Sequence, residues 1–231
     1  MAPYAAGRSA LVEDELTLGA TFIELGGSTT SLAVFSENSL LYADVLPVGG
    51  NHITSDIACG LSTTMAHAER LKTLSGSVLP TLCRDEEAIA VPLLGETGTD
   101  TVQRIPRAQL NDIIRPRVEE IFELLRRRLD SCPAGRRAGR RVVLSGGGSQ
   151  LTGIRETAGH ILGSHVRLAK PHGLSGMPDM MRGPSFCVAA GLLKYAVKPD
   201  LRTLELPRIR EGYGANLGAL SRVGRWIKES F

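Results

Sequence analysis

Two glycine-rich segments contain the residue types that hold phosphate groups. The first, Gly26-Gly27-Ser28-Thr29-Thr30, combines flexible backbone with hydroxyl groups and follows the acidic residue Glu24. Glycine lets backbone N–H groups approach phosphate oxygens, and carboxylate and hydroxyl oxygens suit Mg²⁺. The segment therefore predicts a site that holds phosphate and Mg²⁺ together. A tight turn between two strands would use the same glycines, and both interpretations are open.

The second segment, Gly146-Gly147-Gly148, ends an apolar stretch and precedes a helical pattern. A backbone without side chains at this place can lie against a flat base or a phosphate. The alternative is a close crossing of a helix over a sheet. Neither segment matches the GxxxxGK[ST] phosphate loop or a GxGxxG within a βαβ unit, so those nucleotide-binding families are disfavoured.

A charged helix, Ala68-Glu69-Arg70-Leu71-Lys72, supplies a third element. Glu69 and Lys72 are three residues apart and share a face. The carboxylate could accept a hydrogen bond from a ribose hydroxyl while the ammonium lies near the base or the phosphates. As an isolated pair the two residues would form only a surface salt bridge, so the order of the three elements carries the argument.

The elements that must position these residues follow from the apolar patterns. A meander of three antiparallel strands is predicted over Ala20–Leu25, Leu32–Phe35 and Leu40–Val48. The period then changes to about 3.6, which predicts helices over Ile53–Leu61 and Thr64–Leu74, with Ser62 or Thr63 as an N-cap.

The second half of the pattern alternates strands with helices. Arg107–Leu129 has apolar residues at helical spacing, and Pro116 is expected to kink or divide this helix. The remaining predicted strands are Ala88–Leu94, Arg141–Leu144 and Val166–Ala169, and the remaining predicted helices are Thr152–Leu162 and Pro184–Ala196.

The composition is that of a globular protein that can bury a full core. The chain has 231 residues, 42% hydrophobic and 22% charged, and a net charge of +3, which argues against disorder and coiled coil. Basic residues cluster without interleaved aromatics, so nucleic acid is not predicted as a partner. The four cysteines stand far apart with no metal-ligand spacing, which indicates reduced thiols of a cytoplasmic protein and no metal site.

The last sixteen residues, 216–231, separate an apolar face from a basic one at helical spacing. Leu217, Leu220, Val223, Ile227 and Phe231 fall within an arc of roughly 120°, bordered by Trp226, while Arg222, Arg225 and Lys228 project elsewhere. This pattern fits a helix lying in a membrane surface, beyond a charged linker over 198–215. The alternative is a C-terminal helix packed on its own domain. No stretch is long and apolar enough to cross a bilayer, so membrane contact would be peripheral.

The order of these segments resembles the FtsA family of bacterial cell-division proteins, within the actin/Hsp70-like superfamily. The resemblance rests on the following segments: Val45 to Gly50, Gly60 to Thr63, Ala66 to Lys72, Ile114 to Ile121, Val142 to Leu151 and Gly224 to Lys228. Together they cover nearly the whole chain. The resemblance implies an α/β fold, one lobe of an actin-like (ribonuclease H-like) architecture.

The resemblance also implies a division into parts. Residues 1–15 would be a remnant of the first lobe, and 16–50 with 138–197 the nucleotide-lobe subdomain. Residues 51–137 would be an inserted smaller α+β subdomain that receives the tail of the tubulin-like ring protein FtsZ. Residues 216–231 would be the membrane-targeting helix.

In the family this fold binds ATP with Mg²⁺, polymerises beneath the membrane and anchors the FtsZ ring. Carried over, Gly26 to Thr30 would line the second phosphate loop, Glu69 and Lys72 would flank the nucleoside, and Gly146 to Gly148 would form the adenosine loop. Arg115 and Arg117 would pair with acidic groups of the FtsZ tail. The membrane residues would be Leu220, Arg222, Val223, Arg225, Trp226, Ile227, Lys228 and Phe231, in contact with an anionic surface.

Three departures from the family pattern matter, and the third of them lowers the expected affinity for ATP. Glu24 stands where the family usually has Asp, and Gly27-Ser28 where it has further glycines. The first phosphate loop is also absent, so the chain is expected to be the C-terminal portion, with weak or no ATP binding and no hydrolysis. Two alternatives stay open: an ATP-hydrolysing enzyme related to sugar kinases or chaperones, and a truncated, non-functional gene product.

Overall fold

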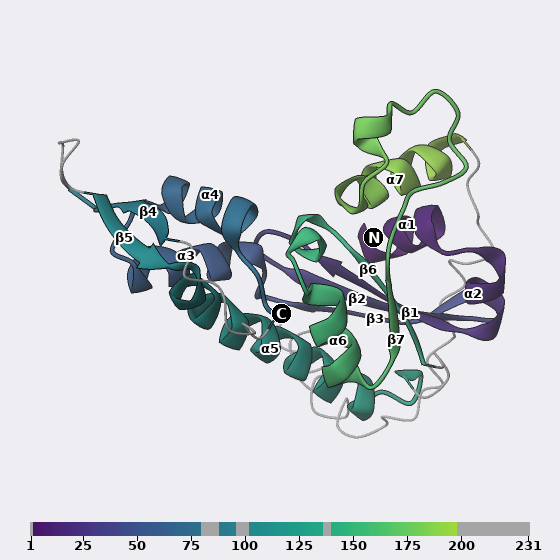
Figure 1. Ribbon diagram of the computed structural model, residues 1–231. Coiled ribbons are helices and arrows are strands. Elements are labelled where there is room, and N and C mark those ends of the chain that lie inside the picture. The colour runs from purple at the N-terminus through teal and green to yellow at the C-terminus, as the bar shows by residue number, and fades with distance from the viewer. Residues whose placement is uncertain (1, 80–87, 96–101, 136–139, 198–231) are drawn as a thin grey trace, which may run out of the picture. The chain divides into compact units, whose positions relative to one another are not determined.

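The computed structural model describes residues 2–79, 88–95, 102–135 and 140–197. A five-stranded mixed sheet lies at its centre, with strand order β3-β2-β1-β6-β7 (Figure 1). The strands are β1 (Ala20–Leu25), β2 (Thr30–Ser36), β3 (Ser39–Leu46), β6 (Arg141–Ser145) and β7 (His165–Leu168). β1, β2 and β3 pair antiparallel, as the meander predicted, while β6 pairs parallel to both β1 and β7.

Helices cover both faces of the sheet because the buried strands are apolar on both sides (Figure 1). Ile23 and Leu25 of β1 point into one core, which they share with α5 (Arg107–Ser131) and α6 (Ile154–Leu162). Phe22 points into the second core, formed with α1 (Ala2–Ala10), α2 (Glu13–Leu18) and α7 (Cys187–Val197). The alternation of β1 side chains between two cores fixes the register of the sheet.

The sequence patterns did not predict α1 and α2, and both are integral to this lobe. Helix α1 packs on α7 so closely that a Cβ on Gly191 would lie 1.8 Å from the carbonyl oxygen of Ala5. Its residues Tyr4, Ala6 and Ala10 are buried in the same core as Phe22. Helix α1 therefore shares a core with the sheet.

Between β3 and β6 the chain forms helices α3 (Gly50–Gly60) and α4 (Met65–Ser75), the two-stranded sheet β4 (Ala88–Pro92) and β5 (Val102–Pro106), and then α5. The first core continues from the sheet into this segment through Ile57, Leu71 and Val91. Strand β5 was not predicted, because Ile105 is its only buried residue.

The predicted N-cap of α4 was wrong, and of the two outcomes predicted at Pro116, a kink or a division of the helix, the division does not occur. Thr64, not Ser62 or Thr63, is the N-cap of α4, and its hydroxyl accepts a hydrogen bond from the backbone N–H of His67. Pro116 does not divide α5, which is one helix of 25 residues. Pro116 is exposed, while Ile114 and Val118 on either side are buried, so packing holds the helix together where one backbone hydrogen bond is lost.

Candidate nucleotide site

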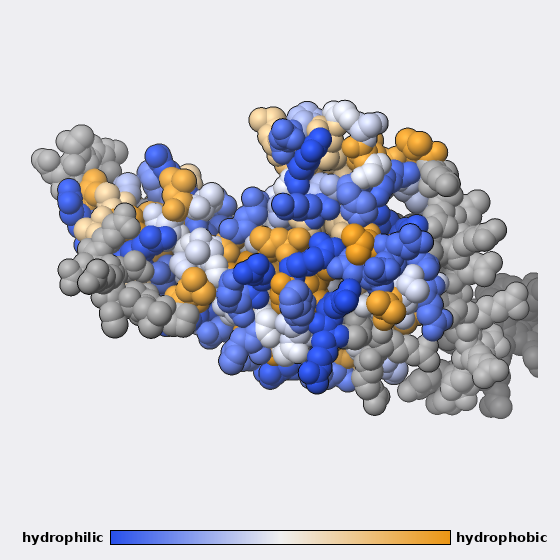
Figure 2. All heavy atoms as spheres, turned by 45° about the vertical axis from the view of Figure 1, so that its right-hand side comes forward, coloured by the Kyte–Doolittle hydropathy of each residue, from blue (hydrophilic) through white to orange (hydrophobic). Residues whose placement is uncertain are grey.

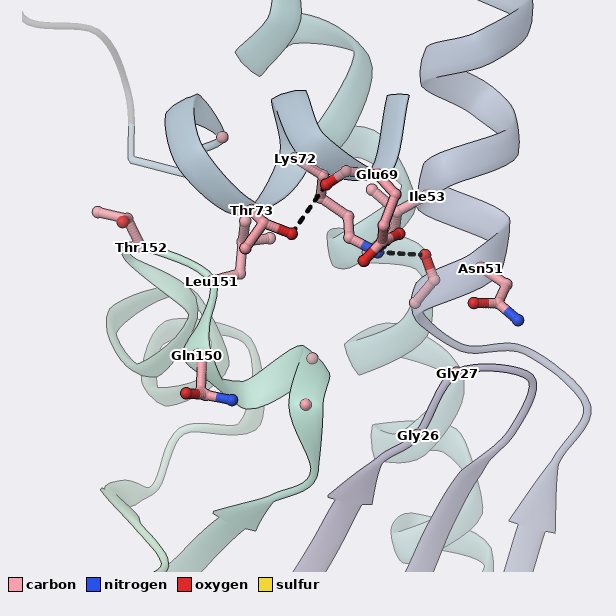
Figure 3. Close-up of a pocket in the computed structure, with 14 residues that line it drawn as sticks. Gly26, Gly27, Asn51, Ile53, Glu69, Lys72, Thr73, Gln150, Leu151 and Thr152 are labelled. Atoms are coloured by element: carbon pink, nitrogen blue, oxygen red, sulfur yellow. Dashed lines mark hydrogen bonds and ion pairs between the residues drawn. The ribbon is translucent and has the colours of Figure 1, made fainter. Parts of the chain in front are cut away.

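Both glycine segments and the charged helix line one cavity of about 480 Å³, a volume typical of small-molecule sites. Its wall consists of Gly26 and Gly27 from the β1–β2 loop, Gly50, Asn51 and Ile53 from α3, Glu69, Lys72, Thr73 and Gly76 from α4 and its end, and Gly147, Gly148, Gln150, Leu151 and Thr152 after β6. In Figure 3, Glu69 and Lys72 lie across the cavity from the loop of Gly26 and Gly27.

Glu69 and Lys72 form a network with the neighbouring helix α3. The Lys72 ammonium donates to Glu69 Oε2 at 2.6 Å, to Thr54 Oγ1 at 2.8 Å and to the Gly50 carbonyl oxygen at 3.1 Å. Thr54 also donates to Glu69 Oε2 at 2.5 Å. Glu69 and Lys72 therefore form an ion pair, as the sequence alone would allow on a surface, but here the pair is also hydrogen-bonded to α3 in the cavity wall.

Electrostatics favour the charged form of Glu69. Burial on its own raises the pKa of this carboxyl, but hydrogen bonds from Lys72 and Thr54 and the positive charge of Lys72 outweigh it and lower the pKa. The Glu69 side chain is 52% exposed and that of Lys72 is 14% exposed. The carboxylate is thus ionised and able to accept a further hydrogen bond from a ligand.

The first glycine loop is held against the start of α3. Backbone N–H groups of Gly50 and Asn51 donate to the carbonyl oxygens of Gly26 and Gly27, at 2.8 and 2.7 Å. In the part of the chain that the structure describes, the N–H groups of Gly27 and Ser28 have no acceptor. Exposed donors on a tight loop are suited to an anion such as phosphate.

The glycines of the second segment have two different roles: one packs against β1 and two line the cavity. Gly146 has a φ of +85°, and a Cβ there would lie 2.3 Å from the Leu25 carbonyl oxygen, so this residue serves the close crossing of backbone. Gly147 and Gly148 line the cavity. Gly146 thus makes a close backbone contact with the end of β1, while Gly147 and Gly148 form part of the cavity wall, and their contact with a base or phosphate stays a prediction.

Five of the predicted site residues do not line the cavity: Glu24, Ser28, Thr29, Thr30 and Gly146. The Thr30 side chain is fully buried and its hydroxyl donates to the Val48 carbonyl oxygen at 2.7 Å, which joins the first loop to the end of the meander. Glu24 is half-buried beside β6, and burial raises the pKa of its carboxyl.

The sequence did not single out Asn51 and Gln150, which line the cavity, or Thr54, which hydrogen-bonds to Glu69 and Lys72 of its wall. Gln150 lines the cavity beside the second glycine segment, and its amide donates to the hydroxyl of Ser185 at 2.8 Å. Asn51 approaches the first loop, with its amide nitrogen 3.4 Å from Ser28 Oγ. No residue spacing signals these contacts, because they join segments far apart in the chain.

Both arginines predicted to bind a partner are paired within the chain. Arg117 donates to both carboxylate oxygens of Asp56 on α3, at 2.7 and 3.0 Å, and also contacts Glu120. The hydrogen bond with Asp56, despite partial burial, raises the pKa of Arg117 well above its ordinary value. Arg115 pairs with Asp112 at 2.8 Å. An acidic partner would have to compete with these carboxylates.

Metal-ligating side chains do not gather in groups of three or more anywhere in the described ranges. Magnesium in nucleotide sites is usually held by phosphates, waters and one or two carboxylates, so the cavity fits Mg²⁺ delivered with a nucleotide. The predicted linker 198–215 and helix 216–231, with all membrane residues named above, lie outside the described residues. None of the described helices is long and apolar enough to span a bilayer.

Comparison with known proteins identifies relatives over nearly the whole chain. The family model "Cell division protein FtsA" matches residues 21–191. The chain is 44% identical to the cell division protein FtsA of Rhizobium meliloti over 99% of its length, and 29% identical to that of Escherichia coli K12 over 100%. It spans about half of these relatives, 52% and 56% of their lengths.

Solved structures with the same fold include MreB5 of Spiroplasma citri bound to ADP, with a TM-score of 0.67 and 20% identity over 84% of this chain and 57% of that chain. The PilM-PilN type IV pilus biogenesis complex matches with a TM-score of 0.60 and 23% identity, over 86% of this chain and 52% of that chain. The fold is therefore a mixed α/β, actin-like lobe.

Proposed function

This chain belongs to the FtsA family of cell-division proteins, and on that premise we propose that it is part of an adaptor that tethers the FtsZ ring to the inner face of the cytoplasmic membrane. The observation that carries the proposal is the convergence of both glycine segments and the Glu69–Lys72 pair on one cavity. Such a cavity suits a nucleotide-regulated scaffold, and the amphipathic sequence of residues 216–231 suits a peripheral anchor.

The cavity residues fit an adenine nucleotide with Mg²⁺. The N–H group of Gly27 would donate to a phosphate oxygen, and Glu69 would accept from a ribose hydroxyl. The backbone of Gly147 and Gly148 would lie against the base. When bound, the nucleotide would add negative charge and bridging contacts between the loops.

The proposal assigns no hydrolysis to this chain. Glu69 is the one carboxylate among the described residues that line the cavity. Both Lys72 and Thr54 already bond to it, so it is not placed as a free base for water.

Calorimetry with Mg-ATP tests the cavity. Glu69→Gln should weaken binding about tenfold, because the ribose contact and the ordering of Lys72 depend on the carboxylate. Glu119→Gln is the matched control, since Glu119 is exposed on α5 and away from the cavity. Equal affinities of the two variants would remove the nucleotide assignment. Measuring phosphate release from ATP separates this proposal, which expects no hydrolysis, from the alternative of an ATP-hydrolysing enzyme.

Vesicle co-sedimentation with an FtsZ tail peptide tests the tether. Full chain should bring the peptide down with anionic vesicles, and deletion of 216–231 should abolish sedimentation with lipid while leaving peptide binding in solution intact. One such helix binds weakly, so several copies in a polymer would provide useful attachment. Lipid binding that survives the deletion would show that the anchor assignment is wrong.

A further inference from the structure

A second cavity lies at the opposite end of the parallel strands from the glycine loops. It has a volume of about 530 Å³ and is lined by Arg140, Arg141 and Val142 at the start of β6, His165 and Arg167 on β7, and Glu15 on α2. None of these residues lines the first cavity. The cavity therefore needs an explanation of its own.

The register of the sheet places the basic side chains together. Arg141 pairs with His165 across the parallel β6–β7 ladder, and Arg167 lies two residues further along β7. Residues aligned in this way, and residues two apart on one strand, share a face. Three basic side chains thus lie on the face that α1 and α2 cover, at the end of the sheet where the strands begin.

Among the described residues of this cavity, Arg167 is the arginine that forms an ion pair, while Arg141 acts on the same carboxylate, Glu15, only through its charge, which helps to lower the Glu15 pKa. Arg167 pairs with the buried Glu15 through two of its nitrogens and donates to the Ala10 carbonyl oxygen at 2.9 Å. For Arg140 and Arg141, the described residues include no carboxylate within ion-pair distance and no acceptor of a side-chain hydrogen bond. The cavity therefore carries an excess of two positive charges, before His165 is counted.

The two unpaired guanidinium groups are adjacent in the chain and exposed. The Arg167–Glu15 pair next to them is fixed by its buried carboxylate, which is 7% exposed. Figure 2 shows that hydrophilic side chains cover much of the described surface, with smaller hydrophobic patches between them. The result is a concave, cationic surface with one rigid wall.

We propose that this cavity binds a phosphate group. A guanidinium donates two parallel hydrogen bonds to phosphate oxygens, and two such groups match the charge of a phosphate monoester. An isolated carboxylate carries half that charge, and a single arginine would satisfy it. The group can belong to a soluble phosphate compound or to a lipid headgroup, because basic pockets facing a membrane also take phosphorylated headgroups.

This site goes beyond the proposed tether and does not depend on it, because binding of soluble phosphate requires no membrane. In the first arm of the test, inorganic phosphate is titrated into full chain and followed by chemical shift changes of the arginine side chains. Arg140→Gln/Arg141→Gln should weaken binding about tenfold. Arg70→Gln/Arg104→Gln removes the same charge from exposed positions on α4 and β5 and should leave it unchanged.

In the second arm, the same chains are sedimented with vesicles of phosphatidylcholine and phosphatidic acid, whose headgroup is a phosphate monoester. A larger loss of vesicle binding in Arg140→Gln/Arg141→Gln than in the control assigns the site to a lipid headgroup. Loss confined to inorganic phosphate assigns it to a soluble compound. Equal behaviour of the two double variants in both arms would overturn the proposal, as would binding of polyglutamate without binding of phosphate. Failure of the tether itself would show separately, as sedimentation with vesicles that survives deletion of residues 216–231.

Discussion

Replacing Lys72 by Met should destabilise the protein by about 2 kcal/mol, because the ammonium joins α4 to α3. Its three acceptors are the Gly50 carbonyl oxygen, the Thr54 hydroxyl and the Glu69 carboxylate, at 3.1, 2.8 and 2.6 Å. Met keeps the aliphatic stem, so little packing is lost.

The expected loss of about 2 kcal/mol follows from how exposed the three acceptors of Lys72 are. The Glu69 side chain is 52% exposed, so water screens this ion pair and its share is at most about 1 kcal/mol. The bonds to Thr54 and Gly50 are less exposed and account for roughly the remaining 1 kcal/mol, since Thr54 itself can turn to the Gly50 carbonyl oxygen, 3.0 Å away.

Urea denaturation at 25 °C measures the free energy of unfolding of Lys72→Met and of Glu69→Gln, alone and combined. The double-mutant cycle should show a coupling of about 0.5 to 1 kcal/mol between the two residues. Lys170→Met is the control, because Lys170 is an exposed cation outside the cavity. A loss below about 0.5 kcal/mol, or a coupling of zero, would refute the reasoning about the network.

The stability difference between wild type and Lys72→Met should depend on pH in a defined direction. The pKa of Glu69 is lowered from its ordinary value of 4.5 in the folded protein, so its contribution is fully present above pH 4.5 and is lost as the pH falls through the folded pKa. The stability difference between wild type and Lys72→Met should therefore narrow in acid. A constant difference down to pH 3 would contradict the assigned cause.

Three further substitutions test other contacts. Gly191→Ala should lower the free energy of unfolding by about 2 kcal/mol or more, because the added Cβ would meet the Ala5 carbonyl, while Gly183→Ala, with open space around it, should be nearly neutral in thermal melts. Thr30→Val should cost about 1 to 3 kcal/mol in the same melts, since it leaves the Val48 carbonyl without its donor. Arg167→Met should cost about 3 kcal/mol at pH 7, since it leaves the Glu15 carboxylate buried and unpaired. Burial raises the Glu15 pKa, but Arg167 and the Val12 N–H outweigh it and lower the pKa, so this cost should shrink as acid protonates Glu15.

The sequence was sufficient where a local pattern decides the structure. Apolar runs separated by turn residues predicted the meander, and helical spacing predicted α5. Strand β5 was missed because it buries one side chain, and a strand with one buried residue has no visible alternation. Helix α1 was missed for a related reason: its burial depends on α7, whose glycine lies far away in the chain.

The candidate site was predictable by residue type but not by role. Glycine-rich strings indicated the two loops, yet they did not separate Gly146, which packs against Leu25, from Gly147 and Gly148, which line the cavity. Thr30, the first residue of β2, shows the same limit, because its hydroxyl donates its hydrogen bond to the Val48 carbonyl oxygen. Which polar atom of a loop is free depends on the partner that the fold brings to it.

The first glycine loop and helix α3 form one mechanical unit. Gly26 and Gly27 accept hydrogen bonds from the first N–H groups of α3, and a Cβ on Gly49 would lie within 2.9 Å of three backbone atoms of the loop. Lys72 bonds the same turn of α3 from the other side. Because α3 also carries Asp56, the partner of Arg117 on α5, a shift of the loop must either break two backbone hydrogen bonds or move α3 against α5. The cavity is thus coupled by backbone contacts to the segment between β3 and β6.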